Sequence, residues 1–215
     1  MVIECIEPVH PCDSNIYVVI GERTALIDTG AGQRPSELLA RLDSVLRGRP
    51  PDLIILTHCH FDHVGGVAML VERFGCDVFA GHKDAVVLRR GDDSVIMGQT
   101  IGVESRPVEV RDLFEGDVID LGGHRLRVIC TPGHTSGGIC LHDETTGALF
   151  TGDTVFAYGV GRTDFSSGSP AELLLSLKRL SGLDVQGLYP GHGQLLRSGG
   201  MESIRNGILM MRDYI

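Results

Sequence analysis

The densest group of chemically active side chains lies in the segment His58-Cys59-His60-Phe61-Asp62-His63. In an extended chain, residues two apart point to the same side, so His58 and His60 can bind one cation at roughly 2.0–2.1 Å. If the chain then turns, Asp62 and His63 can face a second cation beside the first. This spacing therefore predicts a metal site.

Three later turn motifs each place a ligand-type residue directly after an apolar run typical of a strand. They are Thr131-Pro132-Gly133-His134-Thr135, Thr151-Gly152-Asp153-Thr154 and Pro190-Gly191-His192-Gly193. A lone histidine in such a turn is more often a surface residue, but the four motifs together supply five histidines and two aspartates. That mixture suits two divalent ions, with Asp153 as a bridging carboxylate. Three histidines without a partner pattern are interpreted as structural or surface residues: His10, His124 and His142.

The elements that must position these motifs follow from the pattern of apolar residues. Alternating or continuous apolar runs predict strands at 15–20, 23–28, 53–57, 77–80, 118–121, 125–131, 138–142, 148–151 and 187–189. Helical spacing predicts helices at 35–46, 67–74, 83–89, 170–180 and 201–215. Residues 91–107 show weak periodicity and are interpreted as a mobile loop or insertion, and residues 153–169 as a glycine-rich loop. Two sheets with helices outside them accommodate this order.

Composition narrows the function classes. We expect residues 1–215 to form a single domain, because 215 residues suit one large α/β domain. The net charge of −9 makes nucleic acid an improbable partner. With neither a signal-peptide pattern nor a membrane-spanning run, and with six cysteines that form no CxxC pair, we expect a cytoplasmic protein. The apolar stripe of the last helix, Met201 to Ile215, is interpreted as core packing, with a homodimer face as the alternative.

The quoted motifs resemble the five sequence motifs of the metallo-β-lactamase fold superfamily, with Asp28 in Asp28-Thr29-Gly30 as the first. The match extends from residue 28 to residue 192. It implies an αββα sandwich of two mixed β-sheets flanked by helices. It also implies a supporting position near the metals for Asp28 and three sets of ligands: His58, His60 and His134 at site one, Asp62, His63 and His192 at site two, and Asp153 between them.

Two divalent ions about 3.5–4 Å apart can share a water and lower its pKa toward neutrality, so that a bridging hydroxide attacks a carbonyl carbon. Asp62 could orient this hydroxide as the catalytic carboxylate and pass a proton to the leaving group. A thiolate leaves readily and needs little acid assistance. We expect zinc in both positions, with iron or manganese as alternatives, since the same ligands accept all three.

Within the superfamily, two segments favour a thioesterase. Residues 159–165 are similar to a segment of glyoxalase II-like thioesterases and of persulfide dioxygenases. Inside it, Arg162 and Asp164 are interpreted as an ion pair that braces the loop rather than as substrate contacts. The motif at 190–193 is closer to that of the short glyoxalase II-like hydrolases. The leading hypothesis is therefore a hydrolase that cleaves S-acyl-glutathione or another small thioester.

Several alternatives stay open. A persulfide dioxygenase would use one iron held by His58, His134 and Asp153. A lactonase of the same superfamily would use the same two metal positions, and a metal-binding module without turnover is disfavoured by the intact motifs. Full-length glyoxalase II enzymes carry a C-terminal helical domain that binds glutathione, whereas the segment after His192 is short. Other thioesters and esters therefore remain candidate substrates.

Overall fold

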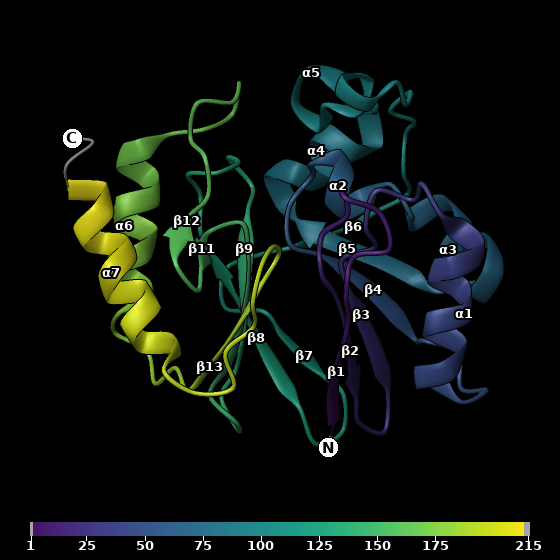
Figure 1. Ribbon diagram of the computed structural model, residues 1–215, viewed down its shortest axis with the longest axis horizontal. Coiled ribbons are helices and arrows are strands. Elements are labelled where there is room, and N and C mark those ends of the chain that lie inside the picture. The colour runs from purple at the N-terminus through teal and green to yellow at the C-terminus, as the bar shows by residue number, and fades with distance from the viewer. Residues whose placement is uncertain (1, 213–215) are drawn as a thin grey trace.

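Two mixed β-sheets form the centre of the computed structural model, which describes residues 2–212 (Figure 1). The first sheet has six strands in the order β1-β2-β3-β4-β5-β6: Val2–Ile6, Ile16–Ile20, Thr24–Ile27, Leu53–Leu56, Asp77–Gly81 and Arg111–Leu113. The second has five strands in the order β13-β10-β9-β8-β7: Gly187–Pro190, Ala148–Gly152, Ile139–Asp143, Arg125–Cys130 and Val118–Asp120. In the first sheet β3 to β6 are parallel, and in the second only β10 and β13 are.

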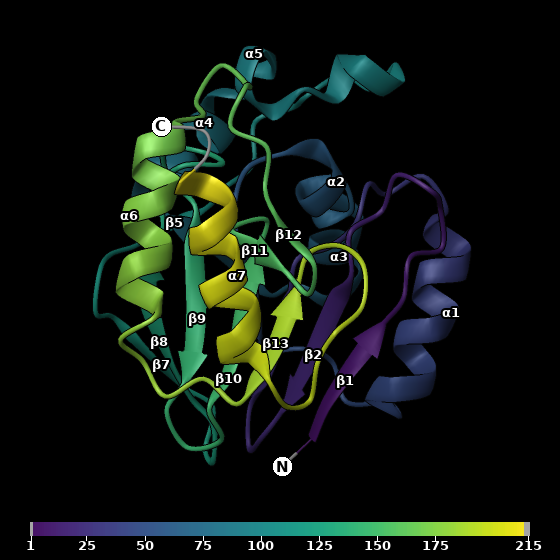
Figure 2. The same cartoon turned by 60° about the vertical axis from the view of Figure 1, so that its left-hand side comes forward.

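Helices cover the outer face of each sheet. The first sheet is covered by α1, α3 and α4, which span Pro35–Leu46, Val67–Phe74 and His82–Arg90. The second is covered by α6 and α7, which span Pro170–Leu180 and Gly200–Arg212 and lie side by side (Figure 2). This arrangement confirms the predicted αββα sandwich. No helix among residues 2–212 is long and apolar enough to cross a bilayer.

Three apolar clusters lie between the four layers of helices and sheets. The strand β4 contributes side chains to two of these clusters. Leu53 and Ile55 face the second sheet, whereas Ile54 and Leu56 pack against the helices outside the first sheet. Successive side chains of a strand point to opposite faces, so a strand buried on both faces is apolar at every position. For this reason the sequence of β4 is a continuous apolar run. The strand is held between these two apolar layers and leads toward His58.

Two of the segments that differ from the expectations are residues 91–107 and the glycine-rich segment after Asp153. Residues 91–107 contain two helical turns, α5 at Asp93–Ile96 and the 3-10 helix η1 at Gly98–Ile101, so the segment has local structure of its own. The glycine-rich segment after Asp153 contains a two-stranded hairpin of β11, Val155–Phe156, and β12, Gly159–Val160. These elements are too short to produce a hydrophobic period in the sequence. Ile215 of the predicted stripe lies outside the described residues.

Candidate metal centre

The first ligand motif follows the carboxyl end of β4. His58 comes two residues after the strand, and His60 has extended dihedral angles of φ −67° and ψ 146° immediately before the one-turn helix α2, Phe61–Val64. That helical turn carries Asp62 and His63. The predicted change of direction after His60 is therefore made by a helix, which separates the two pairs of ligand-type residues.

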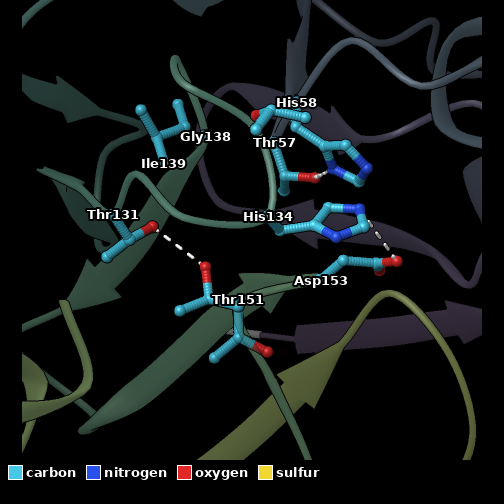
Figure 3. Close-up of a pocket in the computed structure, with 10 residues that line it drawn as sticks. Thr57, His58, Thr131, His134, Gly138, Ile139, Thr151 and Asp153 are labelled. Atoms are coloured by element: carbon cyan, nitrogen blue, oxygen red, sulfur yellow. Dashed lines mark hydrogen bonds and ion pairs between the residues drawn. The ribbon is translucent and has the colours of Figure 1, made fainter. Parts of the chain in front are cut away.

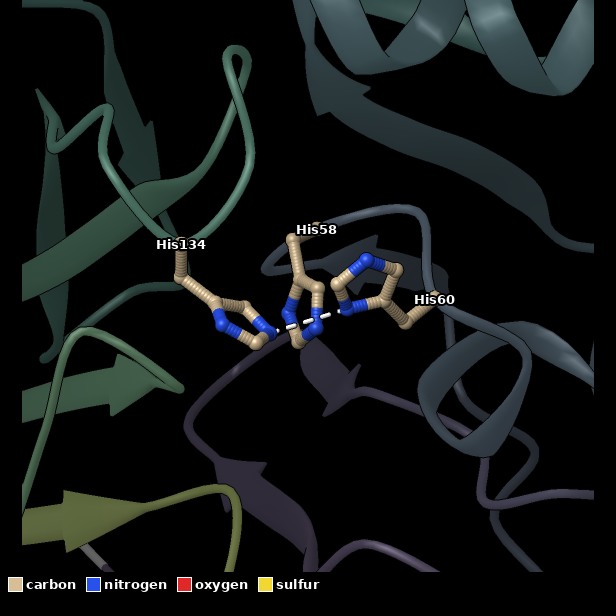
Figure 4. A group of neighbouring side chains, drawn as sticks. All are labelled: His58, His60 and His134. Carbon is tan, nitrogen blue, oxygen red and sulfur yellow. Dashed lines mark hydrogen bonds between the residues drawn. The ribbon is translucent and has the colours of Figure 1, made fainter. Parts of the chain in front are cut away.

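The first group of side chains consists of His58, His60 and His134, whose ligand atoms all lie within 4.8 Å of one another (Figure 4). His60 Nδ1 and His134 Nε2 are 2.8 Å apart, and the ring centroids of His58 and His60 are 4.8 Å apart. All three side chains are buried. Three buried imidazoles at these distances can share one cation.

The second group consists of Asp62, His63 and His192, with Asp153 between the two groups. His192 Nε2 lies 3.0 Å from Asp62 Oδ2 and 3.7 Å from Asp153 Oδ2. His63 Nε2 lies 3.3 Å from Asp153 Oδ1, and His134 Nε2 of the first group lies 3.5 Å from Asp153 Oδ2 (Figure 3). The four sequence motifs, separated by up to 134 residues, thus converge on one place, as the sequence predicts.

Unsatisfied buried atoms test whether this donor set fits cations. Four atoms of the donor set are buried without a hydrogen-bond partner among the described residues: His58 Nε2, His60 Nε2, His63 Nε2 and Asp153 Oδ1. Such orphaned polar atoms are costly in a folded protein unless a ligand satisfies them. Burial and the neighbouring imidazoles hold the pKa of His58 well below its usual value, so its ring is neutral and able to ligate. The donor set therefore fits divalent cations.

Asp28 positions His63 from behind. The Asp28 backbone has φ +62°, a left-handed conformation that is uncommon for a non-glycine residue. Its carboxylate accepts hydrogen bonds from the backbone N–H and hydroxyl of Thr57 and from His63 Nδ1, all at 2.8 Å. Burial lowers the pKa of His63, but Asp28, Asp153 and Asp62 outweigh it and raise that pKa well above its usual value. A carboxylate on Nδ1 directs Nε2 toward the centre, as metal-ligating histidines require.

Asp84, in the first turn of α4, is a functional residue that sequence reasoning missed. Its buried carboxylate accepts hydrogen bonds from the Cys59 N–H at 3.0 Å, the Thr135 hydroxyl at 2.7 Å and the Gly137 N–H at 2.8 Å. It thus joins the loop that carries His58 and His60 to the loop that carries His134. Burial raises the pKa of Asp84 despite these bonds. In the sequence, Asp84 has only the signature of an acidic residue in a first helical turn.

The loop that carries His192 is held by Tyr17 of β2 and by Asn15, the residue before that strand. Asn15 Nδ2 donates to the carbonyl oxygens of Pro190 and Gly193 at 3.0 Å, and the Tyr17 hydroxyl donates to the Pro190 carbonyl at 2.7 Å. Gly191 is required for close approach, because a Cβ there would lie 2.4 Å from Asp153 Oδ1 and 2.5 Å from His63 Cε1. Neither the hydrogen bonds from Asn15 and Tyr17 nor the close approach of Gly191 to Asp153 and His63 can be predicted from the Pro-Gly-His-Gly motif alone.

A cleft of about 350 Å³ gives access to the two groups. Its wall includes five apolar side chains, those of Phe61, Met97, Phe156, Val160 and Phe165. At its rim Arg162 and Asp164 form a two-point ion pair, with N–O distances of 2.9 and 2.7 Å, in agreement with the bracing interpretation. The Arg162 carbonyl oxygen accepts a hydrogen bond from His134 Nδ1 at 2.7 Å, so this loop also orients a ligand-type histidine.

Known proteins with similar sequences and structures show which family this geometry belongs to. The profile of the metallo-beta-lactamase superfamily matches residues 9–192. A probable metallo-hydrolase of Methanocaldococcus jannaschii, MJ0888, is 36% identical over 187 residues, which cover 85% of this chain and 88% of that protein. A hydroxyacylglutathione hydrolase of Maricaulis maris is 41% identical over 137 residues, 63% of this chain, but the match spans only 46% of that enzyme. The crystal structure of TTHA1623 in a di-iron-bound form has a TM-score of 0.78 at 35% identity and covers 95% of this chain and 100% of its own.

Fold and site together define a metalloprotein whose ligand set is assembled between two β-sheets. The chain belongs to the metallo-beta-lactamase superfamily, because the superfamily profile covers most of its length. The histidine and aspartate groups, and the iron in the similar crystal structure, support the binding of divalent metals. The similarity to metallo-hydrolases supports a hydrolase.

Proposed function

We propose that the protein is a thioester hydrolase that uses two divalent cations, one at His58, His60 and His134 and one at Asp62, His63 and His192, with Asp153 shared. The observation that carries this proposal is the convergence of these seven side chains, four of them with orphaned buried atoms, beside an open cleft that five of them line. The similarity to a hydroxyacylglutathione hydrolase supports a thioester as substrate. Zinc is the proposed metal. The six free cysteines support a reducing, cytoplasmic location. Residues 1–215 are proposed to form a single domain.

Cations bound there would lower the pKa of a water molecule and polarise the substrate carbonyl. Asp62 is the proposed proton carrier, because its carboxylate is partly exposed at the cleft and lies beside His192. Burial raises the pKa of Asp62, but His63 and His192 outweigh it, and the pKa lies below its usual value. The ionised carboxylate can accept a proton from the attacking water and return it to the departing sulfur.

The overall reaction consumes one water. A C–O bond forms at the carbonyl carbon, the C–S bond breaks, and the proton released by water ends on the thiol. Asp28 holds the His63 ring, the Arg162 carbonyl holds the His134 ring, and Asp84 holds the two loops together, so the proposed ligands move little during this cycle.

The test is metal analysis of anaerobically purified protein with parallel assays of thioester cleavage, lactone cleavage and oxygen consumption with a persulfide. We expect about two metal ions per chain and thiol release from the thioester. Oxygen uptake with one iron per chain would identify the dioxygenase alternative instead. Faster cleavage of lactones than of any thioester would favour a lactonase.

Substitution separates the hydrolase from the dioxygenase. His60→Ala and His192→Ala each remove a ligand from one of the two proposed positions, so both should suppress thioester hydrolysis. In a one-iron dioxygenase these changes should matter less than His134→Ala. Equal tolerance of all three substitutions would contradict both schemes.

A further inference from the structure

A second hollow of about 300 Å³ lies beside the metal cleft, between α2, α3, α4 and the segment that follows α5. Its volume is at the lower end of the range typical of small-ligand sites, about 300–1,000 Å³. We name it the side pocket. Its lining is mainly apolar and includes Phe61, Val64, Ala68, Leu88, Ile96, Gly98, Val103, Pro107 and Val108. Figure 1 shows α5 above α4 and α2, at one end of the first sheet.

The side pocket adjoins the cleft at two places along the chain. Phe61, which stands between His60 and Asp62 in the chain, lines both hollows. Met97 lines the cleft, and the next residue, Gly98, lines the side pocket. The Phe61 side chain therefore stands between the cleft of the proposed ligands and an apolar hollow next to it. An acyl chain that extends from a carbon above the proposed ligands enters the side pocket by passing Phe61.

The segment from α5 to Val108 is held in place as the wall of this pocket. The carboxylate of Asp93 accepts hydrogen bonds from the Ser105 hydroxyl and from the Gln99 N–H, which closes the segment on itself. The Val108 N–H donates to the Leu88 carbonyl at 3.0 Å, which attaches its far end to α4. Across the cleft, the Ser166 hydroxyl donates to the Ser94 carbonyl at 2.8 Å. The segment at 91–107 therefore encloses apolar space next to the site.

The charges near the two hollows indicate which part of a thioester each can take. The charged side chains that line the side pocket are Glu104 and Arg106, which are exposed and face each other at 3.8 Å. The interior thus offers neither a buried charge nor a ring of donors for the polar carrier of a thioester. An acyl chain needs no such partners, and the charged carrier thiol can remain at the open cleft.

We propose that the side pocket binds the acyl chain of the substrate, so that the preferred substrates are linear acyl thioesters of medium chain length. This inference rests on the proposed thioester hydrolysis. Moving a methylene group from water into an apolar pocket strengthens binding about fourfold. Selectivity should therefore increase with chain length until the pocket is full.

The experiment measures kcat/KM of the metal-loaded protein for acetyl, butanoyl and octanoyl thioesters of one carrier thiol, together with calorimetric binding of octanoate and acetate. We expect kcat/KM to be at least about tenfold higher for octanoyl than for acetyl, because six added methylenes each contribute a factor of up to about four. Octanoate, which has the form of the product acid, should bind more tightly than acetate.

Two variants locate the effect. Ala68→Phe fills the side pocket from α3, and Val103→Asp puts a charge into its wall. Both should lower the octanoyl-to-acetyl ratio at least about fivefold and weaken octanoate binding. Ala40→Phe makes the same substitution at an exposed position of α1, outside the side pocket, and should leave the ratio unchanged. Thermal unfolding of each variant verifies that it is folded.

The outcomes separate this inference from the proposed function. Hydrolysis of thioesters without chain-length preference, or a preference that both variants retain, would overturn the acyl pocket and leave the hydrolase intact. Absence of hydrolysis for every thioester would overturn the hydrolase, and octanoate binding would then decide the pocket alone. In that case, loss of octanoate binding in the Ala68→Phe variant would support an acyl site. Equal binding of octanoate and acetate would reject it.

Discussion

His63 and His124 have similar immediate partners in two separate parts of the molecule. Each ring is buried, each places Nδ1 against the carboxylate of a buried aspartate, and each has an Nε2 without a hydrogen-bond partner among residues 2–212. The partner of His63 is Asp28, and that of His124 is Asp143. His124 lies just before β8, whereas the metal centre includes the turn that follows β8.

The surroundings of the two rings differ. His63 Nε2 faces Asp153 at 3.3 Å and Asp62 at 3.9 Å, and the ring lies 4.0 Å from that of His58 between centroids. The His124 pair instead belongs to a turn, because Asp143 also accepts hydrogen bonds from the Thr145 N–H and the Thr146 hydroxyl. An imidazole–aspartate pair is therefore a device for orienting a ring. Whether the ring can bind a cation depends on the other ligands that face it.

The strongest test of this distinction removes the shared carboxylate. Asp153→Ala takes one acceptor from both proposed cation positions and removes the carboxylate nearest to His63 Nε2. We expect kcat/KM to fall by more than about 100-fold, beyond what loss of an orienting residue causes, and the metal content to fall by at least one ion per chain. Metal analysis and thioester hydrolysis measure both effects. Full metal content and activity in the variant would contradict the role of Asp153.

The second test replaces the aspartate of each imidazole–aspartate pair by asparagine, in two separate variants. Asp28→Asn keeps the shape of the side chain but weakens the hold on His63, so we expect metal affinity to fall by about 10–100-fold. Asp143→Asn is the matched control and should leave metal affinity unchanged. Titration with a competing chelator measures both. Equal losses in the two variants would mean that the His124 pair also contributes to the metal centre.

The third test asks what the His124 pair does. Burial raises the pKa of Asp143, but hydrogen bonds from His124 and Thr146 outweigh it, so its folded pKa lies below its usual value. A depressed carboxyl pKa adds stability above the unfolded value of about 3.9, and that stability disappears as the pH falls through the folded pKa. Asp143→Asn should therefore lower the free energy of unfolding by about 1–3 kcal/mol at pH 7.

Urea unfolding at pH 7 and at pH 3 provides the measurement. The difference between wild type and Asp143→Asn should be smaller at pH 3, where protonation begins to remove the charge from the wild-type carboxyl group. A difference that stays constant or grows toward low pH would show that the ionised form of Asp143 is not what stabilises the fold.

The smallest effect is expected at an exposed pair next to the centre. The side chains of Arg162 and Asp164 are 67% and 64% exposed, and His134 is oriented by the main-chain carbonyl of Arg162 rather than by its guanidinium. Arg162→Ala keeps that carbonyl, and an exposed ion pair adds little to stability, so we expect no measurable loss of stability and a metal affinity within about twofold of the wild type. A large loss of metal affinity would indicate that the ion pair, and not the carbonyl, holds the loop.

The sequence predicted the centre better than it predicted the supports of the centre. Each ligand motif is local and follows an apolar run, so His58, His134, Asp153 and His192 could be placed at strand ends from spacing alone. Helix α3 could be bounded as well, since Gly75 ends it in a left-handed conformation.

The missed supports act across long stretches of chain. Asp84 reaches the Thr135 hydroxyl, 51 residues later, and Asn15 reaches Pro190 across 175 residues. Neither hydrophobic periodicity nor turn rules predict such contacts, because they form only when the two sheets pack together. The strands β1 and β6 were also missed. Val2–Ile6 is mostly exposed on one face and Arg111–Leu113 has three residues, so neither gives a strong apolar pattern.

The hold of Asn15 and Tyr17 on the Pro190 carbonyl has a consequence for how the protein is made. A ribosome synthesises the N-terminal residues first, so Asn15 and Tyr17 emerge long before the loop they secure. During translation the histidines at 58, 60 and 63 are available to bind metal well before His192 exists. The second proposed cation position can therefore be completed only after His192 has been synthesised.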